Sequence, residues 1–410
     1  MLAYLKLAWR NIWRNKRRTL ITVSAIVFAV VLAVMMQSLN RGSYEIVIEQ
    51  NVRFDTGYLQ LQDYRYEDEA SLDNTFLYDA SVRERVLASD NDIAKILPRI
   101  QTFMLAANDD ATRGAIVYGV DHEKEHAFNG FQDHLTAGRF FSSEEHAAVL
   151  TEGMANRLQL SVGDTLVLIG QGRFEMTASG LFEIVGKVQH PIRALNDQAV
   201  YLSLPVAQDL LSAEGRISAL LMAPERERQT ESVAASLREE FDREEDELAV
   251  FTWPELMPEL LQLREFDLAP ARFMTAVLYI VIGFGFLGTI LTSTMERLRE
   301  FGVLLSVGMK RGRLVSVVFL EMLFMSAIGI LVGVAMAWLI ICYLHVNPIA
   351  LTGDAARAVS DMGFEPYIRV SFDADQFYMQ ALYVFLVAML VFLFPLIKIF
   401  RLNILEAARK

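Results

Sequence analysis

Four long uncharged and mostly apolar runs constrain this chain more than any other feature. They cover residues 19–40, 273–295, 322–344 and 376–397. Each is about as long as the ~20 apolar residues that an α-helix needs to cross a bilayer. One run lies near the front and three lie at the back, so residues 41–272 between them are predicted to form a large water-exposed domain. This spacing favours coupling across a membrane over a pore through it.

The charges around the runs predict how the chain crosses the membrane. Residues 1–18 carry six basic side chains and no acidic one, and basic residues also dominate 296–313 and 398–410. Basic residues beside spans mark the cytoplasmic side, so these three segments are expected inside. The segment 41–272, in which acidic side chains outnumber basic ones, is then extracytoplasmic. Its acidic character argues against nucleic-acid binding.

The predicted organisation has four transmembrane helices and a large extracytoplasmic domain on helical stalks. The first apolar run is longer than the roughly 7–15 residues of a signal-peptide core, so it is interpreted as an uncleaved anchor. The predicted segments are a cytoplasmic amphipathic helix (1–18), spans at 19–40, 273–295, 314–344 and 376–397, an extracytoplasmic domain with stalks (41–272), a cytoplasmic loop (296–313), a short extracytoplasmic loop (345–375) and a cytoplasmic tail (398–410).

The N-terminal segment is predicted to form an amphipathic helix. Leu5, Trp9, Ile12 and Trp13 follow a helical spacing, and basic residues occupy the remaining faces. Such a helix lies in the cytoplasmic interface with its tryptophans at headgroup depth. The alternative is a basic anchor without ordered structure.

The segment 41–272 is predicted to be an α+β domain of one or two lobes. The single cysteine, Cys342, lies in the third apolar run, so this domain has no disulfide and depends on its own core. Residues 43–54 and 253–266 are expected as helical stalks. The expected strands are 58–62, 115–120, 147–150, 165–169, 182–188, 199–202 and 217–222, and the expected helices are 80–88, 152–158, 206–211 and 229–244.

The cytoplasmic loop carries the most informative motif. It is predicted to form a short helix with charged residues at its start and bulky apolar residues after them, among them Phe301, Val303 and Leu304. Gly302 and Gly308 permit tight turns or close approach. Apolar groups in a loop between two spans indicate a surface for a partner. The alternative is burial of these residues against the membrane.

This loop resembles the Glu-Arg-x-x-Glu-[Ile/Phe]-Gly-x-x-x-[Ala/Ser]-x-Gly pattern of ABC transporter permease subunits in the macrolide-exporter and lipoprotein-release class, the MacB, LolC, LolE and FtsX group. Segments 7–19, 117–125 and 155–168 also fit this group. The tail 401–409 resembles the family's Pro-x-Glu-Ala-Leu-Arg ending but departs from it at Ile404 and Ala408. The loop residues that match are Glu296, Arg297, Glu300, Phe301, Gly302, Ser306 and Gly308.

The resemblance implies a MacB-type periplasmic core on a permease of the bacterial inner membrane. It implies that the loop docks on a cytoplasmic ATPase, that two permeases form a dimer above two ATPase copies, and that force instead of substrate crosses the bilayer, which is called mechanotransmission. The second permease is a copy of this chain or a homologous one. The residues implied in ATPase coupling are Glu296, Arg297, Arg299, Glu300, Phe301, Gly302, Val303, Leu304 and Gly308.

The chain itself is expected to be non-catalytic and to bind no cofactor. It has no Gly-x-x-x-x-Gly-Lys-[Ser/Thr] phosphate-binding loop, so ATP and Mg are expected on the partner ATPase. The favoured function is extraction of lipoproteins or another lipophilic substrate from the outer leaflet, with a periplasmic chaperone or adaptor as receiver. The alternatives are drug or peptide export with a periplasmic adaptor, and transmembrane signalling to an extracellular enzyme as in FtsX.

A membrane-anchored protease is a further alternative, supported only by the zinc-like pattern His122-Glu-x-x-His126. No third ligand is well placed, although His134 is nearby. An exposed polar turn after the preceding strand is therefore expected, and no metal site or catalytic residue is predicted.

Two features of the spans bear on packing and function. Glu321 lies at the start of the third apolar stretch, where an ionisable residue indicates a functional role, a contact at the helix end or snorkelling to the interface. Small residues permit close approach of helices within the protomer or across a dimer. The glycines expected at such contacts are Gly283, Gly285, Gly288, Gly329 and Gly333.

Overall fold

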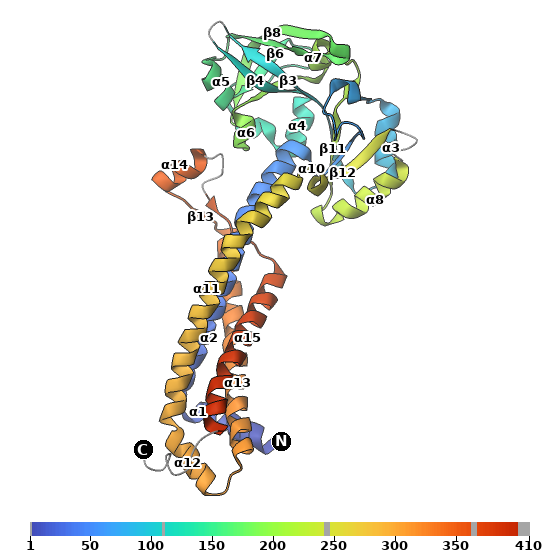
Figure 1. Cartoon of the computed structure of the whole chain (residues 1–410). Coiled ribbons are helices and arrows are strands. Elements are labelled where there is room, and N and C mark those ends of the chain that lie inside the picture. Colours follow the sequence, from blue (N-terminus) through green and yellow to red (C-terminus); the bar gives the residue numbers. More distant parts are fainter. Residues whose placement is uncertain (1, 109–110, 242–246, 362–366, 401–410) are drawn as a thin grey trace. The chain divides into compact units, whose positions relative to one another are not determined.

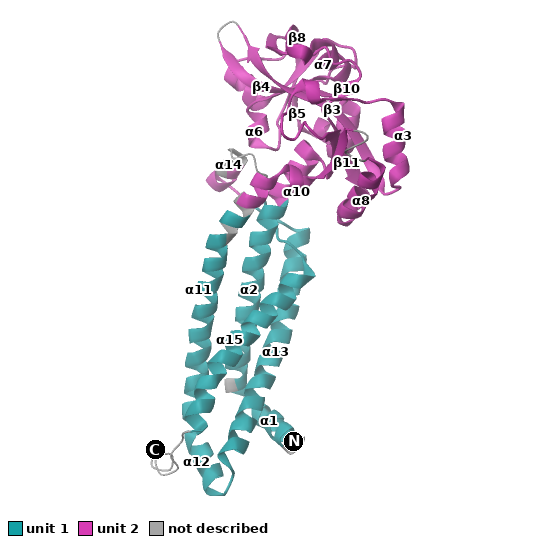
Figure 2. Cartoon of the chain, turned by 45° about the vertical axis from the view of Figure 1, so that its right-hand side comes forward, with its two compact units in different colours: residues 1–45, 263–350, 367–410 teal, residues 46–262, 351–366 magenta. Residues whose placement is uncertain are grey.

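The computed structural model describes residues 2–108, 111–241, 247–361 and 367–400. The tail motif at 401–409 lies outside the described residues. The chain forms two compact units (Figure 2). The helical unit comprises residues 1–45, 263–350 and 367–410, and the sheet unit comprises residues 46–262 and 351–366.

The helical unit is built from long helices, and short connections join α1 to α2, α11 to α12 and α12 to α13 (Figure 1). Among the described residues, four helices are long and apolar enough to cross a membrane: 19–56, 269–296, 311–346 and 374–400. Two of these helices, α2 and α11, continue along the chain into the sheet unit. The helices are α1 (Leu2–Arg14), α2 (Lys16–Asn51), α11 (Pro258–Glu296), α12 (Leu298–Ser306), α13 (Arg311–Val346) and α15 (Ala374–Phe400).

Close packing of α2 against α13 depends on two glycines. A Cβ atom on Gly329 would lie 2.7 Å from a side-chain carbon of Ile26, and one on Gly333 would lie 2.8 Å from Val30. Both neighbours belong to the buried stripe of α2, which recurs at helical spacing. The opposite faces of these helices expose large apolar side chains, as expected of helices surrounded by lipid.

At the end of the helical unit away from α12, polar contacts join α2 to the start of α15 and to the segment before it. Arg41 donates two hydrogen bonds to Asp375, at 2.9 and 3.0 Å. Ser38 donates to the carbonyl oxygen of Ser371 at 2.5 Å, and this backbone lies so close to α2 that only glycine fits at position 42. The short strands β13 (Ile349–Ala350) and β14 (Tyr367–Ile368) pair nearby.

The sheet unit contains a ten-stranded mixed sheet in the order β12-β1-β11-β3-β4-β9-β6-β8-β5, with β7 pairing with β3 and β8. The pairs β4–β9 and β6–β8 are parallel and the others are antiparallel. The strands are β1 (Leu59–Asp63), β3 (Ile93–Ala107), β4 (Thr112–Val120), β5 (Leu135–Gly138), β6 (Ala147–Thr151), β7 (Thr165–Gln171), β8 (Thr177–Val188), β9 (Ala199–Ser203), β11 (Ala219–Pro224) and β12 (Leu248–Thr252).

The α+β domain has two lobes (Figure 1), and a different hydrophobic cluster on the shared sheet lies in each of them. In one lobe, α3 and α8 pack against β1 and β11 through Val86, Val233 and Leu220. In the other, α5 and α7 pack against the central strands through Leu158 and Ala207. The helices of this unit are α3 (Ala80–Ser89), α4 (His122–Asn129), α5 (Glu152–Leu158), α6 (Arg193–Asn196), α7 (Leu204–Leu210), α8 (Thr230–Glu240), α10 (Trp253–Leu256) and α14 (Asp354–Asp361).

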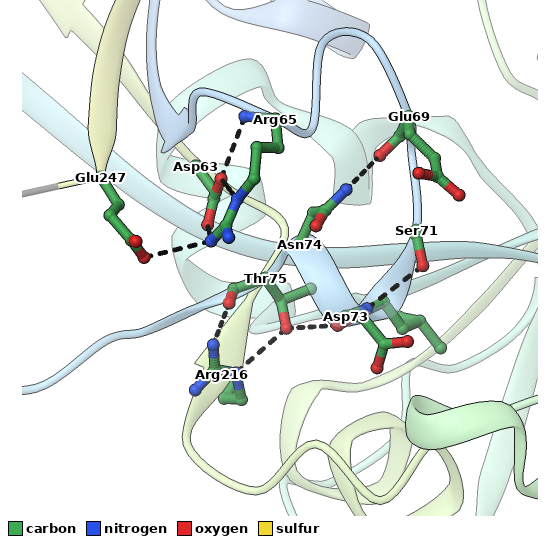
Figure 3. Close-up of polar contacts among 10 residues, drawn as sticks. Asp63, Arg65, Glu69, Ser71, Asp73, Asn74, Thr75, Arg216 and Glu247 are labelled. Atoms are coloured by element: carbon green, nitrogen blue, oxygen red, sulfur yellow. Dashed lines mark hydrogen bonds and ion pairs between the residues drawn. The ribbon is translucent and has the colours of Figure 1, made fainter. Parts of the chain in front are cut away.

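The segment after β1 is held in place by side-chain contacts (Figure 3). Arg65 donates to Asp63 at 2.9 Å and to Glu247 at 3.1 Å. Arg216, in the short strand β10 (Arg216–Ile217), donates to the hydroxyl of Thr75 at 3.1 Å. Burial alone would raise the pKa of the Asp63 carboxyl, but the hydrogen bonds from Arg65 outweigh it and lower the pKa. These contacts stabilise the loop that follows β1.

The structure corrects the expected exposed polar turn at His122–His126. These residues form the helix α4, whose first turn is capped by the Asp121 carboxylate and whose end is set by Gly130 in the left-handed conformation. In the described part of the chain, no three His, Cys, Asp or Glu side chains form a group that could hold a metal ion. The zinc-like spacing therefore coincides with a helix that has a structural role.

Candidate functional site

The predicted coupling loop forms the short helix α12 between α11 and α13. Its first turn carries Arg299 and Glu300 on the surface, and Gly308 ends the loop with a positive φ of 99° that favours glycine. The apolar residues divide between two faces. Val303 is 57% exposed and Leu304 is 39% exposed, whereas Phe301 is 1% exposed.

This division corrects the prediction that the bulky apolar residues of the loop face a partner together. Phe301 and Leu305 pack into the core of the helical unit, and Gly302 is buried beside them. On the surface of α12 that faces away from the bundle, the large apolar side chains are those of Val303 and Leu304. Val307 follows them directly after the helix and is also exposed. The outward face is thus smaller than expected, and the inward face attaches α12 to the bundle.

A buried ion pair lies beneath α12. Arg297 is 8% exposed and Glu321, in α13, is 2% exposed. Their side chains make two contacts, one between Nη1 and Oε2 and one of 3.3 Å between Nη2 and Oε1. Asn11 of α1 donates to the same Oε1 atom at 2.6 Å. Because a buried charge is costly unless paired, the three side chains depend on one another.

Two further contacts extend this group to the surface, and we name Asn11, Arg14, Arg297, Glu300 and Glu321 the hinge cluster. Arg297 Nε lies 3.3 Å from Glu300 Oε2, and Arg14 Nη2 lies 3.4 Å from the same oxygen. The Arg297 guanidinium also lies 5.0 Å from the ring centre of Phe301. The cluster joins α1, α12 and α13 through side-chain contacts.

The sequence indicated one member of the cluster and missed another. Glu321 stood out as an ionisable residue in an apolar stretch, and the structure shows that it is buried and paired instead of snorkelling. Asn11 carried no signal, because its partner lies 310 positions away in the chain. Glu296, at the end of α11, is exposed.

The five glycines singled out in the spans have different surroundings. Gly329 and Gly333 contact α2, as described above. Gly283 lies at van der Waals distance from Val387 of α15, with 3.5 Å to an ideal Cβ. Among the described residues, nothing apart from the neighbouring backbone of α11 itself lies within 4 Å of the Cβ positions of Gly285 and Gly288. These two glycines therefore leave α11 open to a neighbour outside the protomer.

A second polar site lies in the sheet unit, where the chain leaves α2. The residues that directly follow α2 form the π-helical turn η1 (Val52–Thr56). Arg99 of β3, which is 3% exposed, donates to the carbonyl oxygens of Asp55 and Phe54 at 2.8 and 3.0 Å. Its other edge pairs with Glu125 of α4, with 3.1 Å between Nε and Oε2. All three guanidinium nitrogens of Arg99 therefore donate hydrogen bonds. We name Arg99, its partner Glu125 and the two carbonyl groups of η1 the clamp.

The surroundings of this clamp are also buried. Asn129 donates to Glu125 at 2.6 Å, and the Phe54 ring lies between His134 and His190, with centroid distances of 5.3 and 5.8 Å. Burial lowers the pKa of His190 to about 3 and raises the pKa of the Asp55 carboxyl. The clamp fixes η1 to the sheet through backbone carbonyls, which sequence patterns do not reveal.

Comparisons with known proteins cover both units. Residues 19–240 match the MacB-like periplasmic core domain, and residues 272–404 match the FtsX-like permease C-terminal domain. The chain is similar to the pyoverdine export ATP-binding/permease protein PvdT of Pseudomonas aeruginosa, with 23% identity over 397 residues and 88% of this chain covered. It spans 53% of the length of that relative.

Two solved structures resemble part of the chain. The extracellular domain of the noncanonic ABC-type transporter YknZ from Gram-positive bacteria matches with 14% identity and a TM-score of 0.34, covering 47% of this chain and 99% of that domain. The periplasmic region of MacB from Actinobacillus actinomycetemcomitans matches with 13% identity and a TM-score of 0.34, covering 50% of this chain and 94% of that region.

Proposed function

Because this chain belongs to the family of MacB- and FtsX-like ABC transporter permeases, we propose that it couples ATP hydrolysis in a cytoplasmic partner to movement of its periplasmic domain. It is a multi-pass protein of the inner membrane with a large periplasmic domain. The proposed mechanism is mechanotransmission, in which helices carry force across the bilayer and no substrate passes between them.

The observation that carries this proposal is the hinge cluster. A single buried carboxylate, that of Glu321, contacts both Arg297 beside α12 and Asn11 of α1. An ATPase that binds the outward Val303 and Leu304 would therefore move α1, α12 and α13 together. Packing of α13 on α2 through Gly329 and Gly333 passes this displacement to the next helix.

The clamp at Arg99 supports the same mechanism in the sheet unit. Force transmitted along α2 is useful only if the end of the helix is fixed to the domain that it moves. Hydrogen bonds from Arg99 to two carbonyl oxygens of η1 supply such an attachment. Because the bonds go to the backbone, the attachment resists sliding of this turn past β3.

The proposed assembly is a dimer of permeases with two copies of an ABC ATPase, which bind ATP and Mg. The second permease is a copy of this chain or a homologue. The proposed substrate is a lipoprotein or another lipophilic molecule taken from the outer leaflet, with a periplasmic chaperone or adaptor as receiver. Export of a small secreted molecule is the second candidate, because the relative PvdT is named for pyoverdine export.

Co-purification tests the coupling surface. The double variant Val303→Glu with Leu304→Glu places charges on the outward face of α12 without touching the buried Phe301. We expect it to insert into the membrane and to lose the ATPase that the unmodified chain retains. Ile349→Glu is the matched control, because Ile349 is 44% exposed and belongs to β13 instead of α12. Retention of the ATPase by both variants would refute docking at α12.

A further inference from the structure

A polar cavity of about 800 Å³ lies in the helical unit, beside the start of α2 and the end of α11. Its lining includes four basic side chains, those of Arg14, Lys16, Arg17 and Arg297, and the carboxylates of Glu296 and Glu300. The side chains of the hinge cluster contact one another directly, so the cavity is space beyond those contacts. The cavity therefore raises the question of what occupies it.

The charges of the lining leave an excess of one positive charge. Arg297 is paired with Glu321, and Arg14 is paired with Glu300. In the described residues, Lys16 and Arg17 have no ion-pair partner, and Glu296 is the carboxylate that remains. An occupant with one negative charge would balance this lining. If that charge were carried by a phosphate group, its oxygens could contact both Lys16 and Arg17.

The cavity opens onto apolar helix surface. Ile21 lines it one turn beyond Arg17 and is 52% exposed. On α11, Gly288 lines it with open space where a side chain would be, and Phe284, one turn away, is 70% exposed. A charged pocket that continues into an apolar surface suits an amphiphile with an anionic head.

The position along the membrane normal agrees with a lipid headgroup. The cavity includes residues 14–17, which cover the end of α1 and the start of α2 at the basic, cytoplasmic end of the first span. Trp9 and Trp13 of α1 are 46% and 56% exposed, as expected of side chains at the interface between headgroups and acyl chains. Anionic lipids attract basic segments at this depth.

We propose that this cavity binds an anionic phospholipid with a hydroxylated headgroup, of the phosphatidylglycerol class. Lys16 and Arg17 contact the phosphate, and the acyl chains follow the exposed surfaces of α2 and α11. The hydroxyls of Thr289 and Thr292 donate to carbonyls of their own helix at 3.0 Å, so their oxygens are available as acceptors. With the Glu296 carboxylate, they accept hydrogen bonds from the headgroup hydroxyls.

Lipid binding to the purified full-length chain tests the proposal, with native mass spectrometry as the readout. The probes are phosphatidylglycerol, phosphatidylethanolamine, phosphatidylcholine and inorganic phosphate. We expect phosphatidylglycerol to be retained most strongly. The variant Lys16→Gln with Arg17→Gln should bind it roughly 30-fold more weakly, as the loss of two lipid-facing cations implies. The control Lys6→Gln with Arg10→Gln removes two exposed cations of α1 outside the cavity and should bind it nearly as well as the unmodified chain.

A second pair of variants tests the cavity without changing charge. Gly288→Leu fills the cavity and should abolish selective retention, whereas Gly285→Leu, also in open space but outside the lining, should preserve it. If the two double variants that remove cations lost lipid binding equally, the lipid would be held by general attraction to the basic surface, and this result would overturn the proposal. So would equal binding of the three lipids, full competition by inorganic phosphate, or loss of the lipid whenever the chain is dimeric, which would assign the cavity to a second permease.

Discussion

Arg297 and Glu321 form a buried ion pair at the junction of α11, α12 and α13, with 3.3 Å between Nη2 and Oε1. The two residues are 24 positions apart in the chain. Their pairing gives the coupling loop a rigid attachment to the third span. The arginine of the Glu-Arg motif at the start of the loop therefore has a structural reason.

Glu321→Gln should destabilise the helical unit, because it removes the buried counter-charge of the Arg297 guanidinium and leaves only the exposed Glu300 carboxylate beside it. Breaking one partner of a buried pair costs about 3–5 kcal/mol, which thermal unfolding of the purified chain would reveal as a lower midpoint. The double variant Arg297→Met with Glu321→Leu should recover most of this stability but not stimulation of the partner ATPase. Normal stimulation in the double variant would show that the pair has no role in coupling.

Arg99→Lys should loosen the attachment of η1 although it preserves the charge. A lysine ammonium cannot reproduce the fork that contacts Glu125 and both carbonyls, and each buried group left unsatisfied costs about 1–3 kcal/mol. Arg139→Lys is the matched control, since Arg139 pairs with Glu145 at the surface, where water and salt screen an ion pair and its contribution to stability is small. Faster proteolysis near residues 52–57 in Arg99→Lys alone is the expected result. Equal protection in both variants would argue against the clamp.

The stability of the sheet unit should fall as the pH decreases from about 6.5 towards 3. The folded pKa of His190 is lowered to about 3 from its usual 6.5, so between these values the unfolded chain binds a proton that the folded chain does not. The contribution is complete above pH 6.5. His190→Asn, whose amide oxygen can accept the bond from the Ile192 N–H, should weaken the pH dependence measured by denaturant unfolding. An unchanged pH profile would exclude His190 as its source.

Gly333→Leu should disrupt packing of α13 against α2, because the Cβ alone would lie 2.8 Å from Val30. Gly285→Leu is the control within a span, since its Cβ would meet no other element within 4 Å in the part of the chain that the structure describes. We expect a lower unfolding temperature for Gly333→Leu and little change for Gly285→Leu in the monomer. Loss of dimer in Gly285→Leu with unchanged monomer stability would assign that face of α11 to the second permease.

The sequence predicted the parts of the sheet unit whose patterns are local. The predicted helix at 152–158 coincides with α5, and the predicted strands overlap observed ones. The long strand β3 was missed because its buried positions change side along the strand, where it pairs first with β11 and later with β4 and β7. Proline, which lies at position 98 of β3, is also disfavoured inside strands. Helix α4 was missed because its polar sequence resembles a turn.

The sequence by itself determined that the chain has four membrane helices, a preferred orientation and an α+β domain between the first two, since these follow from runs of apolar residues and from local charge. Only the tertiary structure decided that Phe301 faces inward, that Glu321 meets Asn11 and Arg297, and that Arg99 holds backbone carbonyls of η1. The physical reason is distance along the chain. Local patterns record which residues leave water, whereas the partner of a buried charge is set by how distant helices and strands pack.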